Sequence, residues 1–555
     1  MRDNLTIYVK RALDTLASEG RLPKPVPIPE IEMTRDRKFG DYATNVAMIL
    51  GSKTGRNPRD LAQEIAEKIR AADAGGELKD VSVAGPGFIN MTMGPAFWTR
   101  ILRSVLEEGA EFARTDIGEG RKVQVEFVSA NPTGPLHVGH GRGAALGDAL
   151  ANLLECSGFE VEREYYINDA GNQIQTLGRS VFTRYLQAFG RDVPFPDEGY
   201  RGEYIMELAA LLKGSEGDRY LKMRDSEAIE SIATRASELI LEDIRSDLEE
   251  FGVRFDLWFS EKKLLGKGKV DEALNDLDAR GCMYRHEGAL WFNSTEKGDD
   301  KDRVMVKSDG ALTYFATDVA YHRDKFDRGV DRVIDIWGAD HHGYVARMKA
   351  AVQALGRDPD DLQVLLLQLV NLSRKGQPVA MSTRSGEFVT LREVREEVGR
   401  DAARFIFLTR KADSKLDFDL DLAKEQSNEN PVYYVQYAHA RICSILRNAR
   451  EKGVSAPLPE DVDPSFLDLP EERELIRSMA ALPEVVEGAA LALEPHRITT
   501  WLRDISTTLH NYYFHHRVLT EDTAVTGSRL ALVLGVRTVI AKALSLLGVT
   551  APERM

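Results

Sequence analysis

The sequence predicts an α/β protein whose centre is a doubly wound parallel sheet of the Rossmann type, with a small α+β domain before it and an all-α bundle after it. Three observations predict this class. An apolar segment at 123–130 is followed by the breaker Asn131–Pro135 and then by a Gly/Ala-rich amphipathic run to Leu153, which is the order strand, loop, helix. Strand-like and helix-like segments alternate to about residue 423. From Asn430 onward the pattern changes to long amphipathic helices.

Size and composition are those of an ordinary multidomain globular protein. The chain has 555 residues, of which 43% are hydrophobic and 29% charged, and this length suits about three or four domains of ~150 residues. Its three cysteines, Cys156, Cys282 and Cys443, form no C-x-x-C pair. This spacing argues against structural zinc and against a disulfide framework, and favours a reducing, cytoplasmic location. The most apolar stretch, 530–549, is interrupted by two basic residues, so neither a membrane span nor a signal peptide is expected.

Residues 1–115 are expected to form the small α+β domain. A first helix should end near Gly20, and a proline-rich connection follows it. A second helix is expected to begin with residues 41–45, and a third after Asn57-Pro58, where asparagine can cap and proline can occupy the first turn. The segment VSVAGPGFINMTM (81–93) predicts a strand pair around a Gly-Pro-Gly turn.

Residues 120–425 are expected to contain the parallel sheet. The strand candidates are 123–130, 159–169, 303–309 with its partner 312–318, and 332–340. The stretch near 179–265 is mostly helical and highly charged, and it is predicted to be an insertion between the two halves of the sheet. Residues 428–555 are expected to form the bundle, with helices at 430–450, 472–493, 496–519 and 528–549.

Two histidines three residues apart, His137 and His140, open the helix of the 125–153 segment. A helix start offers unpaired N–H groups and a positive dipole end, so the backbone of Gly139–Gly141 is expected to bind an anion. The glycines there would let a ligand approach closely. The imidazoles would donate hydrogen bonds to phosphate oxygens during displacement at phosphorus. The alternative, that both histidines are ordinary loop and cap residues, is disfavoured by the strand–loop–helix context.

The HVGH segment resembles the HIGH signature of class I aminoacyl-tRNA synthetases. GDYATNVAM and VAGPGFINMTM resemble the N-terminal domain of arginyl-tRNA synthetases, which contacts the tRNA elbow in that family. ENPVYYVQYAHARICSILR (429–447) and LSLLGVTAPERM (544–555) resemble the two ends of that family's anticodon-binding domain. The resemblance implies an arginine–tRNA ligase that forms arginyl-adenylate from arginine and ATP with Mg²⁺. It also implies transfer of arginine to the 3′ end of tRNA(Arg) and activation that depends on bound tRNA.

The resemblance also implies an ATP site with a KMSKS loop, for which residues 379–391 are the candidate. Met381 and Ser382 match that loop, but Ala380 and Thr383 stand where the family has lysines. Charge stabilisation is then expected from Arg384, with Arg374 and Lys375 as the next cations along the chain. The alternative is a polar surface loop without a ligand. The expected catalytic residues are His137, His140 and Arg384, and the expected ATP-binding residues are Thr133, His137, Gly139, His140, Met381, Ser382 and Arg384.

Arginine recognition requires carboxylates in fork geometry, because a guanidinium cannot lose its proton in a protein. The resemblance implies that Glu126, before the HVGH loop, and Asp318, on the strand candidate 312–318, hold this group. It implies further that Tyr314 packs against the substrate and that Asn131 binds near its α-carboxylate, with Ser129 beside it.

Three points about this pocket are left open by the sequence. Asp340, in the WGADHHGY segment, stands where many family members have glutamine. It is included in the arginine site, but its role and that of His341 are undefined. The paired acids would alternatively be salt-bridge partners of Arg323 or Lys307. Neighbouring histidines suggest a metal, but no further ligands lie nearby in the sequence, so no metal is expected.

Aromatic and basic residues interleave on the helix that begins near Asn430. Tyr433, Tyr437, His439 and Arg441 are expected to bind single-stranded tRNA bases by stacking and cation–π contact. The alternative is that the tyrosines belong to the core. The net charge of −15 disfavours a nucleic-acid partner in general, but residues 431–555 carry 13 Lys/Arg against 15 Asp/Glu. A monomer is expected.

Two other functions are compatible with parts of the sequence. A dinucleotide-dependent enzyme would use Gly141, Gly143 and Gly147, but this spacing is one residue too long for G-x-G-x-x-G. A non-catalytic RNA-binding relative would explain the missing KMSKS lysines. The retention of the other site residues argues against it.

Overall fold

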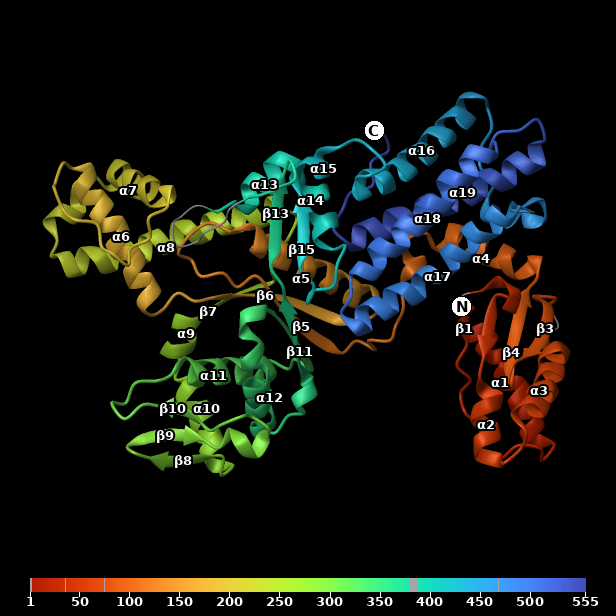
Figure 1. Ribbon diagram of the computed structural model, residues 1–555, viewed down its shortest axis with the longest axis horizontal. Coiled ribbons are helices and arrows are strands. Elements are labelled where there is room, and N and C mark those ends of the chain that lie inside the picture. Colours follow the sequence, from red (N-terminus) through yellow and green to blue (C-terminus); the bar gives the residue numbers. More distant parts are fainter. Residues whose placement is uncertain (1, 35, 74, 380–387, 468) are drawn as a thin grey trace.

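The computed structural model describes residues 2–555 except 35, 74, 380–387 and 468 (Figure 1). It shows an N-terminal α+β part, a central five-stranded parallel sheet with helices, and a C-terminal helical bundle. The predicted fold class is therefore confirmed. In the described part of the chain, no helix is long and apolar enough to cross a membrane.

The N-terminal part is a four-stranded antiparallel sheet with helices on it, in the order β1-β2-β4-β3. Its elements are α1 (Arg2–Ser18), β1 (Glu32–Met33), β2 (Tyr42–Thr44), α2 (Val46–Thr54), α3 (Pro58–Ala72), β3 (Leu78–Ala84) and β4 (Phe88–Met93). The expected helix start at 41–45 is wrong, because the side chains of Tyr42 and Thr44 are buried in the strand β2 and the helix begins only at Val46. The Asn57 cap is confirmed, since its side chain accepts from the N–H groups of Arg59 and Asp60.

The central sheet has five parallel strands in the order β12-β11-β5-β6-β7. The strands are β5 (Lys122–Glu126), β6 (Glu160–Ile167), β7 (Leu257–Ser260), β11 (Arg332–Gly338) and β12 (Leu362–Leu367). The chain runs outward from β5 to β7 on one side and from β11 to β12 on the other. The order therefore reverses between β5 and β11, and ligands of such sheets bind at this point, beyond the carboxyl ends of the strands.

Long segments are inserted between the strands of the sheet. Helices α6 (Asn172–Ala188), α7 (Glu203–Glu216) and α8 (Asp225–Glu250) follow β6 and project from the molecule (Figure 1). The helical insertion predicted near 179–265 also contains β7, which the sequence reading missed. Four residues of a short, mostly half-buried parallel strand show no alternation that would separate them from a helix. After β7 come α9 (Glu261–Gly266), α10 (Lys269–Ala279) and an antiparallel sheet of β8 (Met283–His286), β9 (Ala289–Phe292) and β10 (Arg303–Val306).

Of the two strand predictions in this region, the first is confirmed as a strand but lies in another sheet, and the second is wrong. Residues 303–306 form β10, which pairs with β9 in the small antiparallel sheet and not in the parallel one. Residues 312–318 do not form a strand, because the Thr313 hydroxyl caps a helix, α11 (Tyr314–Asp327), by accepting from the N–H of Ala316. The buried residues Phe315, Ala316, Val319 and Ala320 have the spacing of a helix face, which the β-forming composition of 312–317 obscured.

The remaining elements connect the sheet to the bundle. Between β11 and β12 lies α12 (Val345–Ala354), and after β12 come β13 (Val370–Arg374), β14 (Gln377–Pro378), α13 (Leu391–Val398), α14 (Arg400–Phe407), β15 (Leu416–Asp419) and α15 (Leu420–Lys424). The bundle consists of α16 (Pro431–Glu451), α17 (Pro470–Ala492), α18 (His496–His515) and α19 (Thr523–Leu546), which match the four predicted helices. The helix α4 (Pro95–Glu108) packs against α17 and α19.

One buried arginine joins the bundle to the central sheet. Arg404 of α14 is 0% exposed, and its guanidinium donates to Leu547 O at 3.0 Å and to Phe251 O and Gly252 O at 3.2 Å. It also donates to the carboxylate of Asp148, in the helix α5 (Val138–Cys156) that connects β5 to β6. Arg404 therefore links α14 to the ends of α8 and α19 and to the middle of α5.

Replacing Arg404 with leucine should destabilise the protein strongly, because it removes the cation that donates to the buried Asp148 carboxylate, whose other cation, the Arg163 guanidinium, lies farther away at 3.7 Å. We expect a loss of about 3–5 kcal/mol, measured as a lower urea midpoint and a lower thermal midpoint. Arg224→Leu is the control, since the Arg224 side chain is 81% exposed in its pair with Glu227 and such pairs contribute about 0–1 kcal/mol. Equal midpoints for the two variants would contradict the role given to Arg404.

Candidate active site

The start of helix α5 is built around two stacked histidine rings. His137 is the N-cap, and its Nδ1 accepts from the N–H groups of Gly139 (3.1 Å) and His140 (3.3 Å). His140 Nδ1 accepts from the N–H of His137 at 3.2 Å, and the ring centroids are 3.6 Å apart with 13° between the planes. Since both Nδ1 atoms accept, both rings carry their proton on Nε2. The pair thus presents two N–H donors beyond the helix cap.

This arrangement contradicts the anion site expected on the backbone of residues 139–141. The N–H groups of Gly139 and His140 are bonded to His137 Nδ1, and that of Gly141 donates to His137 O at 3.2 Å. Packing by itself requires glycine at positions 139 and 141. A Cβ at Gly139 would lie 2.9 Å from the His137 ring, and one at Gly141 would lie 2.6 Å from Leu391 Cδ1. The imidazole Nε2–H groups remain as the donors of this helix start.

Both histidines are neutral at pH 7. Burial lowers the pKa of His137 below its usual value, and burial, followed by the proximity of His137, lowers the pKa of His140 to about 3. Two neutral rings can stack closely without charge repulsion. They can act on an anion through hydrogen bonds but not as cations.

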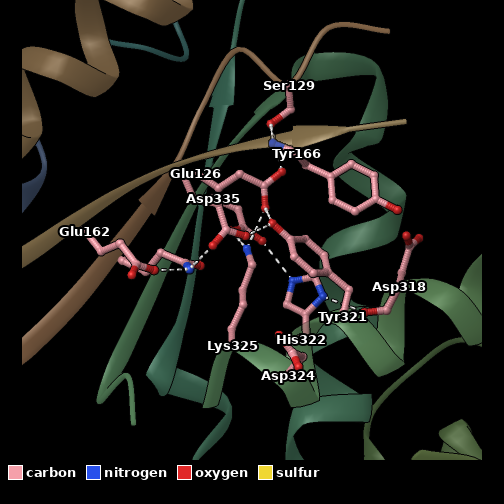
Figure 2. Close-up of polar contacts among 12 residues, drawn as sticks. Glu126, Ser129, Glu162, Tyr166, Asp318, Tyr321, His322, Asp324, Lys325 and Asp335 are labelled. Atoms are coloured by element: carbon pink, nitrogen blue, oxygen red, sulfur yellow. Dashed lines mark hydrogen bonds and ion pairs between the residues drawn. The ribbon is translucent and has the colours of Figure 1, made fainter. Parts of the chain in front are cut away.

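A buried lysine ties the two strands of the switch point together. Lys325 of α11 is 0% exposed, and its Nζ lies 2.5 Å from Glu126 Oε2 and 2.8 Å from Asp335 Oδ1 (Figure 2). Glu126 ends β5 and Asp335 is its register partner on β11. Burial alone would lower the pKa of Lys325, but the charges of Asp335 and Glu126 raise it above the usual value. Lys325 and Asp335 were missed in the sequence because single charged residues in a helix and a strand carry no motif.

Glu126 is fully engaged within the protein. Its Oε2 also accepts from the Tyr321 hydroxyl at 2.9 Å, and its Oε1 accepts from Ser129 Oγ at 3.0 Å. Ser129 Oγ in turn accepts from the N–H of Tyr166 at 3.1 Å. Val128 and Ser129 have φ values of 67° and 41°, a left-handed backbone that β-branched valine rarely adopts. The hydrogen bonds of Ser129 hold this turn at the end of β5.

A second pair of acids, Asp318 and Glu261, lies next to this cluster. Asp318 is in the second turn of α11, and the Tyr344 hydroxyl donates to its Oδ2. Burial raises the pKa of Asp318 to about 6, against the lowering effects of Tyr344 and His322. Glu261 directly follows β7 and is 6% exposed. Burial, with Asp318 as the next cause, raises its pKa to about 7, and the nearby Tyr166 hydroxyl acts against this rise.

Neither acid of this pair has an arginine or lysine partner among the residues that the structure describes. Asn168 Nδ2, with its amide turned to satisfy both groups, donates to Glu261 Oε2 at 2.8 Å. Figure 2 shows the Asp318 and Tyr166 side chains pointing away from Lys325. A buried acid, Glu261, and a half-buried one, Asp318, without a cationic partner among the described residues form a site for a cation. The sequence reading missed Glu261 because β7, which positions it, was not predicted.

The other residues expected to bind arginine line the surroundings of these acids. Asn131 Nδ2 donates to Gln173 Oε1 at 2.7 Å. Tyr314 begins α11 and is 71% exposed, with its hydroxyl close to Gly171. Asp340 lies in the turn after β11 with its side chain 84% exposed. The salt-bridge alternative for Asp318 is not formed, since Arg323 pairs with other acids, Glu272, Asp276 and Asp327.

The expected phosphate-binding loop is only partly described. Met381, Ser382 and Arg384 lie outside the described residues, as do Ala380 and Thr383. Before this loop, Arg374 Nη2 pairs with Glu397 at 2.5 Å, so its charge is already balanced. On the other side of the site, Thr133 O accepts from the Tyr204 hydroxyl at 2.8 Å.

The bundle carries an aromatic surface on α16 and α18. The rings of Tyr433 and Tyr437 are stacked with centroids 5.9 Å apart, and the Arg441 guanidinium lies 4.6 Å from the Tyr437 ring and 4.9 Å from that of Tyr513. His439 is not part of this surface. It is 5% exposed, and its Nδ1 bonds Pro552 O at 2.9 Å, so the structure contradicts its expected contact with tRNA. The sequence did not identify Tyr513 or the exposed Phe514 beside it on α18, because their partner helix is distant in sequence.

Comparison with known proteins covers the three parts of the chain. A family model for the N-terminal domain of arginyl-tRNA synthetase matches residues 3–93, and one for the DALR anticodon-binding domain matches residues 435–555. The model for the catalytic domain of class I (R) tRNA synthetases matches residues 101–437.

The chain belongs to the arginyl-tRNA synthetase family.

Two similar relatives are arginine–tRNA ligases. One, from Syntrophotalea carbinolica, is 53% identical and the other, from a Geobacter species, is 51% identical, each over 100% of both chains. An arginyl-tRNA synthetase structure from Thermus thermophilus has a TM-score of 0.76 over 100% of both chains and, at 24% identity, shows the shared fold. This arginyl-tRNA synthetase is a class I ligase that uses ATP. The dinucleotide-dependent alternative is therefore wrong.

The two raised carboxyl pKa values predict how arginine affinity depends on pH. A guanidinium bound by Asp318 (pKa about 6) and Glu261 (pKa about 7) would pair with their ionised forms, so protons on these acids would compete with it at low pH. The KM for arginine in ATP–pyrophosphate exchange should fall by up to about tenfold per unit as the pH rises through these values, and level off above about pH 8. A KM that stays constant over the range from about pH 5.5 to about pH 8 would contradict this assignment.

Proposed function

We propose that this ligase binds the guanidinium of arginine between Asp318 and Glu261, beyond the carboxyl ends of β5, β6 and β7. The observation that supports the proposal is that the half-buried Asp318 and the buried Glu261 lie close enough to influence each other and have no arginine or lysine partner among the described residues. A guanidinium presents its N–H donors in a fixed plane and can bond two carboxylates at once. The compact ammonium of lysine would leave one carboxylate poorly paired, which supports selectivity without an editing site.

In this proposal Glu126 does not have the guanidinium-binding role that the family resemblance implied. Lys325 already neutralises its charge at 2.5 Å, so Glu126 positions Ser129 and does not bind the guanidinium. Ser129 and Asn131 lie on the loop between β5 and the histidine pair, where the amino and carboxylate groups of arginine would reach. Tyr314 would cover the substrate from the exposed start of α11. Asp340, in the exposed turn after β11, would lie at the rim of the same site.

Activation would occur beside the histidine pair. An oxygen of the arginine α-carboxylate attacks the α-phosphorus of ATP, and the bond to the bridging oxygen of pyrophosphate breaks. Because the attacking group is already an anion, no general base is needed. The Nε2–H groups of His137 and His140 would donate to the phosphate oxygens as charge shifts toward the leaving group. Mg²⁺ enters with ATP as part of the substrate.

The remaining parts of the nucleotide site are proposals carried by the family resemblance. Arg384 would balance the charge of the leaving pyrophosphate in place of the KMSKS lysines. Thr133, Gly139, Met381 and Ser382 would line the ATP site around it. In the second step, a 3′-terminal ribose hydroxyl of tRNA(Arg) attacks the carbonyl carbon of arginyl-adenylate and AMP leaves. We propose further that activation requires bound tRNA, that the protein is located in the cytoplasm and that it is a monomer.

Arginine-dependent ATP–pyrophosphate exchange, with and without tRNA(Arg), tests the proposed site. Wild-type protein should exchange only with tRNA present. Glu261→Gln should raise the KM for arginine about 10–100-fold, because it removes a charged hydrogen-bond partner, with little change in the KM for ATP. Glu272→Gln is the control, since that side chain is 51% exposed on α10. An arginine KM that stays at the wild-type value in Glu261→Gln would show that the guanidinium binds elsewhere.

The aromatic surface of α16 and α18 should bind unpaired tRNA bases. Tyr437→Ala should lower kcat/KM for tRNA about 5–100-fold, because one stacking contact contributes about 1–3 kcal/mol, while kcat at saturating tRNA stays unchanged. Tyr284→Ala, at the exposed Tyr284 of β8, should leave both values unchanged. A lower kcat with an unchanged KM for tRNA would contradict the binding role.

A further inference from the structure

Two tyrosines lie beside the acids of the proposed guanidinium site. The Tyr344 hydroxyl donates to Asp318 Oδ2, and the Tyr166 hydroxyl is near enough to Glu261 to lower the pKa of that acid. Burial is the main cause that raises the pKa of both phenols well above the usual value. Both hydroxyls therefore keep their protons and act as donors throughout the neutral range.

The ring of Tyr344 is held from three sides. It ends the turn after β11 and makes edge contacts with Trp337, at 5.9 Å between centroids, and with Phe315, at 6.0 Å. The Arg347 guanidinium lies 4.7 Å from its centroid. These contacts come from β11, α11 and α12, so the direction of the hydroxyl is fixed by the elements that form the site.

The ring of Tyr166 is held equally well on β6. It lies 4.6 Å from the Tyr321 ring and 6.2 Å from that of Phe259, while its N–H donates to Ser129 Oγ. Figure 2 shows its phenol end on the same side as Asp318. Tyr166 is thus connected by its backbone to the Glu126 turn and by its hydroxyl to Glu261.

We propose that Tyr344 and Tyr166 are positioning residues for guanidinium recognition, each fixing one carboxylate in orientation and keeping it ionised before arginine binds. This inference rests on the proposed function of Asp318 and Glu261. A carboxylate with one lone pair bonded to a tyrosine hydroxyl keeps its other oxygen for a guanidinium N–H. The hydroxyls therefore prepare the two acids for a forked cation before any substrate is present.

The charges around each acid show why a neutral donor matters there. Asp318 faces the acids Glu126 and Asp335, which raise its pKa, and the Tyr344 hydroxyl and His322 act against them. His322 is itself engaged, since its Nε2 bonds Asp335 Oδ2 at 2.9 Å and its Nδ1 bonds Asp318 O at 2.8 Å.

Glu261 is in a similar position. It faces Asp318 and Asp169, which raise its pKa, and the Tyr166 hydroxyl lowers it. Without its tyrosine hydroxyl, each acid would take up a proton near neutral pH. Arginine would then have to displace that proton.

The test compares Tyr344→Phe with wild type in ATP–pyrophosphate exchange at saturating ATP and tRNA(Arg), from pH 6.5 to pH 9. Phenylalanine keeps the ring contacts and removes only the hydroxyl. The KM for arginine should rise about threefold at pH 6.5 and about twofold at pH 7, because the pKa of Asp318 moves up from about 6 by about one unit, and it should return to the wild-type value at pH 9. Both kcat and the KM for ATP should stay near wild type. Tyr166→Phe should behave in the same way through Glu261.

Tyr284→Phe is the matched control, because it removes a tyrosine hydroxyl that donates to an aspartate, Asp302, at 2.9 Å on an exposed surface. It should leave the KM for arginine unchanged at every pH. A rise in KM for Tyr344→Phe and Tyr166→Phe that is equal at pH 7 and pH 9 would overturn the inference, since a packing defect is not rescued by pH. So would an unchanged KM in both variants. Failure of wild-type protein to exchange with arginine would instead overturn the proposed function.

Discussion

The edge of the sheet that carries the site depends on one buried cation, Lys325. Its Nζ bonds the last residue of β5 and its register partner on β11, the two strands between which the chain order reverses. Without this cation the two acids would repel each other, and nothing would compensate for the hydration that they lose on burial. The two carboxylates are therefore stable in this place only together with Lys325. The turn that follows β5 is fixed through Glu126 and Ser129. The histidine pair comes directly after that turn.

Charge is distributed over the site in two layers. The inner acids, Glu126 and Asp335, are neutralised by Lys325 within the protein. The outer acids, Asp318 and Glu261, have only neutral donors as hydrogen-bond partners in the described part of the chain, namely Tyr344, Tyr166 and Asn168. Where ATP would bind, the histidines are neutral too. The substrate guanidinium would therefore be the cation that completes the outer layer.

The sequence predicts the parts of this site that are local and misses those that depend on tertiary structure. The strand–loop–helix segment that contains His137 and His140 spans about 30 residues, so it can be recognised from local sequence. The four bundle helices are predicted by the periodicity of their apolar residues. Glu261 depends on β7, a four-residue strand recognisable only by its partner β6. Asp318 was expected on a strand, because the β-forming residues 312–317 conceal a helix capped by Thr313. Lys325 and Asp335 acquire meaning only when α11 packs against β11.

The bonds of Arg404 have a consequence for synthesis on the ribosome. Leu547 O, which accepts from Arg404, and Leu546 O, which accepts from Asn152 of α5, come after the whole central sheet in the sequence. A nascent chain that has released all five strands still lacks these acceptors, so the Arg404 Nε–H and the Asn152 amide near the end of α5 each lack one hydrogen-bond acceptor. The central sheet of this enzyme therefore should not reach its final stability during translation, and chaperones would meet it as an incomplete domain.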